Sequence, residues 1–255
     1  MGYILRPPRV EEVEVEVPTP VGLELVYAVD FTTHAPLSLN GGDIGYTLTG
    51  VDGDGNAAAD TWTLTGGAKC SGVAISSSGL RYTGCTGNVY LEVVLGALAP
   101  AVGDNDRFVA FLKLTDNPTH IDHQLVWRLG NSGNTYAAEF QRKYIAGPIF
   151  GYRRRDASAN TDTNTATTGV AGPYTCLALE WTRHGVTFWR GTWADPFPEL
   201  STLTRQVDLG FNLSGGVSWP FSRATDKFTL RAVAGATPLT ATFQKIVIAR
   251  QASEP

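Results

Sequence analysis

Residues 174–191 read YTCLALEWTRHGVTFWRG, and this stretch, the central hairpin, predicts two antiparallel β-strands. Large apolar residues occupy every second position of its first half, a period that is typical of a strand with one buried face. These residues are Leu177, Leu179 and Trp181. Arg183-His184-Gly185 interrupts the pattern, and Gly185 is predicted to supply the positive φ of a tight turn. The returning strand then carries Val186, Phe188 and Trp189.

Similar short-strand patterns continue through the chain beyond its first 22 residues. About fourteen strands are predicted, separated by glycine-rich turns and without long helical stripes between them. Residues 156–169 are predicted as a polar surface loop, and residues 193–219 as irregular chain with at most a 3₁₀ turn in 195–203. The pattern predicts one all-β domain over residues 23–255, an antiparallel two-sheet jelly-roll sandwich. Its predicted core includes Leu177, Leu179, Trp181, Phe188, Phe228, Leu230, Ile246 and Ile248.

Composition excludes several classes of protein. The chain has 255 residues, of which 43% are hydrophobic and 17% are charged. The net charge of −4 argues against a dedicated nucleic-acid-binding protein, because it provides no overall basic field. No apolar run is long enough for a transmembrane helix, and the first residues lack the apolar core of a signal peptide. We therefore expect a protein that is made in the cytoplasm, without export by the general route or membrane insertion.

Residues 1–22 differ from the rest and are predicted to form an extended N-terminal arm. Its valines alternate with glutamates, which gives a strand with one apolar and one acidic face. These residues are Val13, Val15, Val17, Glu12, Glu14 and Glu16. Prolines on both sides confine such a strand to a sheet edge or an inter-subunit contact. We expect the arm to bind a neighbouring subunit by strand addition or wrapping, with a disordered tail as the alternative.

Metal ligands and cysteines give only weak signals. The spacing of four residues matches part of a calcium loop: Asp52, Asp54, Asn56 and Asp60. The glycine and the bidentate glutamate of such a loop are missing, so an ordinary polar turn is the stronger interpretation. Three cysteines do not form a disulfide framework, although the first two flank a predicted hairpin and can pair if oxidised: Cys70, Cys85 and Cys176. We expect no metal and no cofactor.

Two motifs resemble the concanavalin A-like sandwiches, a family of lectins, laminin-G domains and glucanases. One is the central hairpin, with LALEWTRHG turning into VTFWRG. The other is residues 240–250, TATFQKIVIAR, which resembles the strand that closes these sandwiches beside the first body strand, here LVYAVDF. The resemblance covers roughly residues 22–250 and implies a concanavalin A-like fold, of the kind found in virion structural proteins of tailed bacteriophages.

The resemblance does not extend to the catalytic motif of the family. Catalytic members carry three acidic residues spaced as E-x-D-x-E on one strand, and no such triplet occurs here. Glu180 and Glu139 each stand alone in their predicted strands. Because glycoside hydrolysis needs two carboxylates across a cleft, we expect a protein that is not an enzyme.

Aromatic and basic residues supply two candidate contact surfaces. Three of the six tryptophans lie near irregular chain and form a candidate platform for carbohydrate, with core packing as the alternative: Trp189, Trp193 and Trp219. Five basic residues on two successive predicted strands form a candidate patch for an acidic surface, with a solvated hairpin end as the alternative. They are Arg142, Lys143, Arg153, Arg154 and Arg155.

These features lead to three functional hypotheses. The first is a non-enzymatic virion structural protein of a tailed bacteriophage (a capsid decoration, fibre or tail-associated protein), held by its arm to other virion subunits. Its Thr-, Gly- and Ala-rich strands with few charges resemble those of phage virion proteins, and a homo-oligomer is expected. The second is a lectin-like module that binds a carbohydrate such as a cell-surface glycan. The third is a glucanase-like glycoside hydrolase, which would need two facing carboxylates.

Overall fold

The computed structural model describes most of the predicted sandwich domain. The described residues are 22–39, 44–52, 56–65, 72–85, 89–94, 107–114, 124–130, 137–144, 148–155, 160–165, 175–182, 185–210, 227–233 and 239–251. Residues 1–21, which make up nearly all of the predicted arm, therefore lie outside the described part of the chain.

Regular structure within these residues consists of β-strands and two short 3₁₀ helices. The strands are β1 (Glu24–Asp30), β2 (Leu37–Leu39), β3 (Ile44–Asp52), β4 (Ala57–Thr65), β5 (Gly72–Ser76), β6 (Gly79–Cys85), β7 (Val89–Val94), β8 (Arg107–Leu114), β9 (Gln124–Gly130), β10 (Ala137–Tyr144), β11 (Pro148–Arg155), β12 (Asn160–Thr165), β13 (Cys176–Thr182), β14 (Gly185–Gly191), β15 (Thr204–Gly210), β16 (Lys227–Val233) and β17 (Leu239–Gln251). The helices are η1 (Phe31–Thr33) and η4 (Leu200–Thr202). Neither of these described helices has the length and hydropathy needed to cross a bilayer.

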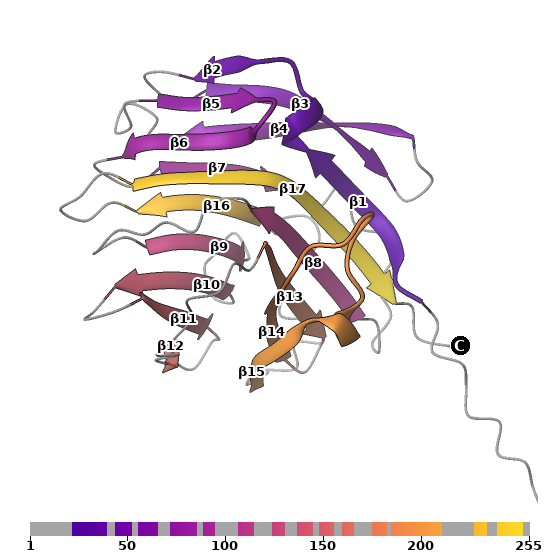
Figure 1. Ribbon diagram of the computed structural model, residues 1–255, viewed down its shortest axis with the longest axis vertical. Helices are drawn as coiled ribbons and strands as arrows, with labels where there is room; N and C mark the ends of the chain where they lie inside the picture. Colours follow the sequence, from indigo (N-terminus) through magenta and orange to yellow (C-terminus); the bar gives the residue numbers. More distant parts are fainter. Residues whose placement is uncertain are drawn as a thin grey trace, which may run out of the picture.

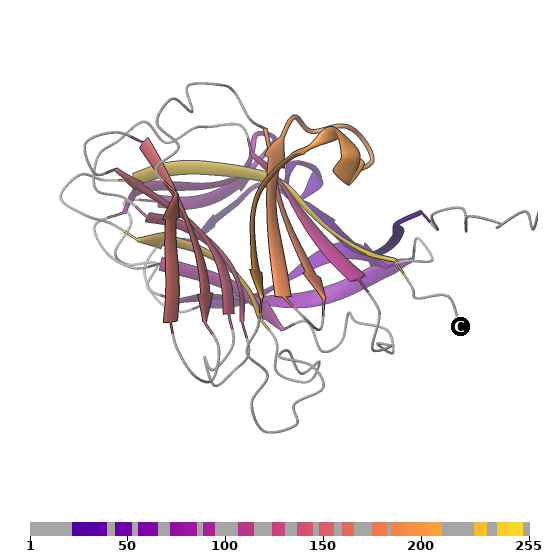
Figure 2. The same ribbon diagram turned by 90° about the horizontal axis from the view of Figure 1, so that it is seen from below.

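The strands are arranged in two antiparallel layers (Figures 1 and 2). The hairpin sheet has the order β3-β1-β17-β8-β13-β14-β15 and contains the central hairpin as β13 and β14. The second sheet has the order β4-β7-β16-β9-β10-β11-β12. The β3–β4 hairpin connects the layers, and the first half of β17 pairs with β6, which continues through β5 to β2. The fold is therefore the predicted antiparallel jelly-roll sandwich.

The closing strand lies where the sequence predicted it. β17 pairs with β1 from Arg250 opposite Glu24 to Lys245 opposite Asp30, and with β8 on its other side. A register shift between Phe243 and Lys245 marks the point where β17 passes from β6 to β8. One long strand thus contributes to both halves of the sandwich.

Six of the eight predicted core residues are buried, with exposed fractions of 6% or less. They are Leu177, Leu179, Trp181, Phe188, Ile246 and Ile248. Trp181 stacks on Phe108 of β8, with the ring centroids 5.4 Å apart. The side chains of the other two, Phe228 and Leu230 on β16, lie outside the described part of the structure. Alternation in the sequence therefore identified the interior face of the hairpin sheet correctly.

The opposite, outer face of the hairpin sheet is also buried over much of its area, which corrects the prediction of one buried face. Its apolar residues come from four neighbouring strands, and they pack under Leu200 and Leu203. The sheet residues are Ala28, Val109, Phe111, Cys176, Ala178, Val247 and Ala249. The covering segment, residues 192–203, is called the strap here and crosses this face as the orange coil of Figure 2.

Specific contacts hold the strap against the sheet. Phe197 stacks on Phe111, with centroids 5.5 Å apart, and the backbone N–H of Trp193 donates to Thr175 Oγ1 at 2.8 Å. Gly191 leaves space for Leu203, because a Cβ at position 191 would lie 2.7 Å from Leu203 Cδ2. The strap therefore forms a second, smaller core on the outer face.

Three observed strands were not predicted from the sequence, and two of them correct a specific expectation. β12 lies within the predicted loop 156–169, where its alternating threonines suit a strand and its backbone pairs with β11. β15 lies within residues 193–219, which were predicted to be irregular, and pairs with β14. The short strand β2 pairs with β5. The predicted 3₁₀ turn is present as η4.

The turn of the central hairpin also differs from the prediction. Gly185 is the first residue of β14 and pairs with Thr182, so it does not occupy a central turn position. The connection is left to residues 183 and 184, which lie outside the described part of the chain. Two-residue connections are the commonest β-hairpin loops.

Candidate functional site

A group of polar side chains lies on the outer face of the hairpin sheet, toward the end of the central hairpin that carries its turn. This outer-face cluster consists of Arg107, Glu180, Trp189 and Gln251. Arg107 donates from Nε to Glu180 Oε1, and its terminal nitrogen donates to Gln251 Oε1 at 3.1 Å. Trp189 Nε1 donates to Glu180 Oε2 at 2.8 Å. Both carboxylate oxygens of Glu180 are therefore engaged by side-chain donors.

The fold explains how these four residues meet. Arg107 begins β8 and lies directly opposite Gln251, the last residue of β17. Glu180 lies on β13 next to β8, and Trp189 lies on β14 where its pairing with β15 shifts register. The side chain of Glu180 is 12% exposed and that of Arg107 is 35% exposed, so the ion pair is partly shielded from solvent. Partial shielding strengthens the interaction relative to a fully exposed pair.

The two described tryptophans of the predicted platform both lie on this outer face and are half-buried. Trp189 has the guanidinium of Arg205 6.0 Å from its ring centroid. Trp193 lies in the strap, with the ammonium groups of Lys113 and Lys245 at 5.5 and 5.8 Å from its ring centroid. Trp219 lies outside the described residues. Each ring packs on the second core while keeping some surface exposed, and the carbohydrate platform stays a prediction.

The surroundings of Trp193 are strongly polar. Its Nε1 donates to Asp195 Oδ1 at 2.9 Å. This hydrogen bond, together with the positive charge of Lys113 and more weakly of Lys245, holds the pKa of Asp195 below its ordinary value. An ionised carboxylate at the Nε1 edge and two ammonium groups over the ring therefore surround the indole.

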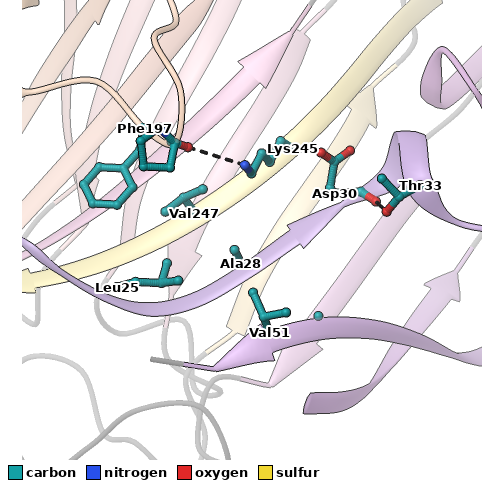
Figure 3. A pocket seen from close by; sticks show the side chains of 10 residues that line it. Leu25, Ala28, Asp30, Thr33, Val51, Phe197, Lys245 and Val247 are labelled. Carbon is teal, nitrogen blue, oxygen red and sulfur yellow. Dashed lines mark hydrogen bonds between the residues drawn. The ribbon is translucent and has the colours of Figure 1, made fainter. Parts of the chain in front are cut away.

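A pocket of about 320 Å³ opens beside the strap, between the strap and strands β1, β3 and β17 (Figure 3). Its apolar lining consists of Leu25, Ala28, Gly50, Val51, Pro196, Phe197 and Val247. Its polar lining consists of Asp30, Thr33 and Lys245. Lys245 Nζ donates to the Pro196 carbonyl at 3.4 Å, which ties the strap to β17. The volume lies at the lower end of the range of small-ligand sites.

The structure does not bring the two candidate catalytic glutamates together. Glu180 lies on β13 in the hairpin sheet, whereas Glu139 lies on β10 in the second sheet. The register places Glu139 opposite Arg128 of β9 on one side and Arg153 of β11 on the other.

The predicted basic patch divides into two groups along one hairpin. Arg142 and Lys143 lie opposite Phe150 and Ile149, near the β10–β11 turn. The other three, Arg153, Arg154 and Arg155, lie at the far end of β11, opposite Glu139, Ala138 and Ala137. The register therefore places the two groups toward opposite ends of one hairpin, and the contact patch stays a prediction.

The candidate calcium residues fall on the β3–β4 hairpin. Asp52 is the last residue of β3. Asp60 lies within β4 opposite Leu48, three pairs away from Val51–Ala57, the pair nearest the β3–β4 turn. Asn56 is exposed, and Asp54 lies outside the described residues. Within the described residues, no group of three or more His, Cys, Asp or Glu side chains could hold a metal ion.

The remaining predicted residues have no described interaction with the outer-face cluster. Cys176 is a free, buried thiol, and burial raises its pKa to about 12. Cys85 ends β6, whereas Cys70 lies outside the described residues, as do the six arm residues Val13, Val15, Val17, Glu12, Glu14 and Glu16. Arg107 and Gln251 were missed, because Arg107 lies 73 residues from Glu180 and 144 residues from Gln251 in sequence, and neither residue carries a local motif.

Comparison with known proteins gives similarity in architecture. No protein-family model and no curated protein sequence matches this chain. Solved structures with a similar arrangement include a glycosyl hydrolase family 16 protein from Mycobacterium smegmatis, with a TM-score of 0.43, 15% identity, and coverage of 88% of this chain and 99% of that one. A pseudo β-1,3-glucanase of Mycobacterium tuberculosis has a TM-score of 0.42 at 15% identity, covering 71% and 78%. Domain 4 of an extracellular arabinanase from Geobacillus stearothermophilus, solved with arabinotriose, has a TM-score of 0.40 at 13% identity, covering 91% and 95%.

Proposed function

We propose that this protein is a non-enzymatic β-sandwich that binds carbohydrate on the outer face of its hairpin sheet. One observation carries the proposal: the half-buried ring of Trp189 is fixed by Glu180 beside the polar groups of Arg107 and Gln251. A sugar ring has apolar C–H faces and a rim of hydroxyl groups. A fixed indole offers an apolar face for stacking, while guanidinium, carboxylate and amide groups offer donors and acceptors for hydroxyls.

The same arrangement supports binding without hydrolysis. A glycosidase needs two carboxyl groups about 5 to 9.5 Å apart, one of them available as an acid or nucleophile. Glu180 is already an acceptor for Arg107 and Trp189, and Glu139 lies on the other sheet. A carboxylate held in this way suits the positioning of an aromatic ring better than proton transfer to a leaving group.

Replacing Trp189 with alanine is expected to weaken carbohydrate binding at least tenfold. Loss of one stacking platform costs roughly 1.4 kcal/mol, which corresponds to a factor of ten. The measurement is binding of the full chain to an oligosaccharide panel and a soluble β-glucan, followed by calorimetric titration of the best binder. Trp193→Ala is the matched control, because Trp193 is also half-buried on the second core but lies away from the outer-face cluster. Equal losses in both variants, or no binding by the unaltered chain, would refute the proposal.

The second candidate function is that of a structural subunit in a virus particle, such as that of a tailed bacteriophage, held by its arm. The alternating valines and glutamates of residues 12–17, flanked by prolines, support this candidate. An apolar stripe of this kind gains stability mainly by docking on another surface. Sedimentation velocity of the full chain should then show self-association that increases with protein concentration, and a monomer at all concentrations would argue against it.

A further inference from the structure

We propose that the pocket beside the strap receives a valine side chain from the N-terminal arm of a second copy of this chain. The inference rests on the second candidate function, an assembly held by arms. The occupant is the segment 12–17, with Val13, Val15 or Val17 in the pocket and a neighbouring glutamate at its rim.

The pocket has the chemistry that an apolar side chain requires. Leu25, Ala28, Val51 and Val247 project toward its centre in Figure 3. Val51 is 38% exposed and is the large apolar residue most open to solvent within the described part of the chain. The exposed part of Val51 thus leaves apolar lining of the pocket that a bound side chain would cover.

The rim of the pocket carries both ammonium and carboxylate groups, and Lys245 of β17 lies opposite Asp30 of β1. Lys245 lines the pocket, and Lys113 lies near it because both ammonium groups are within 6 Å of the Trp193 ring. Two carboxylates share this region. Asp195 hydrogen-bonds to Trp193, while Asp30 already accepts hydrogen bonds from the backbone N–H and hydroxyl of Thr32. The ammonium group of Lys245 at the pocket can therefore pair with a glutamate that follows or precedes the bound valine.

The sequence between the arm and β1 favours binding of the arm to the pocket of a second copy over binding to the pocket of its own chain. Leu25 lines the pocket and follows Gly22 by only three residues, so docking in the same chain requires a sharp reversal between Val17 and Gly22. Pro18 and Pro20 fix their own φ angles and push the residues before them toward extended conformations. Such an extended preference favours docking on a neighbouring copy over docking on the same chain. Glu12 lies ten residues before Gly22, so an extended chain carries the segment 12–17 up to about 35 Å from Gly22, toward a neighbour.

Cysteine cross-linking in the full-length chain tests this assignment. Val51→Cys is combined in turn with Val13→Cys, Val15→Cys and Val17→Cys, and each pair is oxidised mildly and analysed on non-reducing gels. At least one pair should give a dimer band that disappears on reduction. The control replaces Val51→Cys with Arg81→Cys, because Arg81 is exposed on β6 and does not line the pocket. Each single-cysteine variant provides the background from the native cysteines.

A charge swap provides a second test, made in the cysteine pair that gives the most cross-linked dimer. Lys245→Glu should lower the dimer yield about tenfold, and Glu14→Lys in the same chain should restore it. Equal cross-linking at positions 51 and 81, or a disulfide formed within one chain, would overturn the assignment. If the chain self-associates in sedimentation but position 51 does not cross-link, the pocket is wrong and the arm-held assembly still stands. If the chain remains monomeric and uncross-linked, both fail.

Discussion

Replacing Phe111 with alanine is expected to lower the free energy of unfolding by about 3–5 kcal/mol, the usual cost of emptying a fully buried phenylalanine site. Phe111 lies on the outer face of β8 and is 0% exposed, because Phe197 of the strap stacks on it. A loss of this size is a large fraction of the 5–15 kcal/mol that typically stabilises a domain. Urea unfolding followed by fluorescence measures it directly.

The size of this loss distinguishes a covered outer face from an exposed one. If the strap left that face open, Phe111→Ala would behave as a surface substitution and cost about 0.5 kcal/mol. Val51→Ala provides the control for such behaviour, because Val51 is 38% exposed. Similar small effects in both variants would contradict the second core.

Gly79→Ala is expected to destabilise the protein by about 2–4 kcal/mol, because both strain and a steric clash oppose the new methyl group. Gly79 has a φ of +111°, in a region that residues with side chains rarely adopt. A Cβ there would lie 2.2 Å from the Phe243 carbonyl oxygen, so the backbones of β6 and β17 would have to separate. The affected contact lies where β17 passes from β6 to β8.

Gly72→Ala is the matched control in the neighbouring strand. A Cβ at Gly72 would meet nothing within 4 Å, and its φ does not require glycine. The substitution should leave the free energy of unfolding unchanged or raise it slightly, since alanine restricts the unfolded chain. Equal stability of the two variants in parallel urea titrations would show that β6 does not approach β17 as described.

Alternation of apolar and polar residues predicted which side chains fill the interior of the sandwich, because strand geometry alone decides which residues share a face. Leu177, Leu179 and Trp181 share a face of β13 since successive side chains point to opposite sides of a strand. The outer face carries small residues, Cys176 and Ala178, which sequence alone does not distinguish from exposed ones. Their burial depends on the strap, and the prolines of the strap made it resemble an ordinary loop.

The same limit explains the strands that the sequence did not reveal. β12 reads NTDTNT, which contains no apolar residue, so only its pairing with β11 defines it as a strand. β15 contains Val207 and Leu209 in alternation, but the prolines that precede it favoured an irregular interpretation. Polar edge strands are defined mainly by backbone hydrogen bonds to a neighbouring strand, and the residue types of a strand do not reveal such bonds.

The candidate site was predictable only in part. Trp189 and Trp193 were identified from their position near irregular chain, and both lie on the outer face. Their partners were not identifiable, because Arg107 meets Glu180 only through the pairing of β8 with β13. This contact depends on the order of the strands in the sheet, which a local sequence pattern does not reveal.

The most direct test of the central claim, carbohydrate binding without cleavage, is mass spectrometry of oligosaccharides recovered from the full-length protein. The immobilised chain is incubated with a β-glucan oligosaccharide mixture, washed and eluted, and the same is done with Glu180→Gln, which keeps an acceptor for Trp189. We predict that bound oligosaccharides are recovered at their original length from both proteins. Shortened products from the unaltered chain that disappear in Glu180→Gln would contradict the account and identify Glu180 as catalytic.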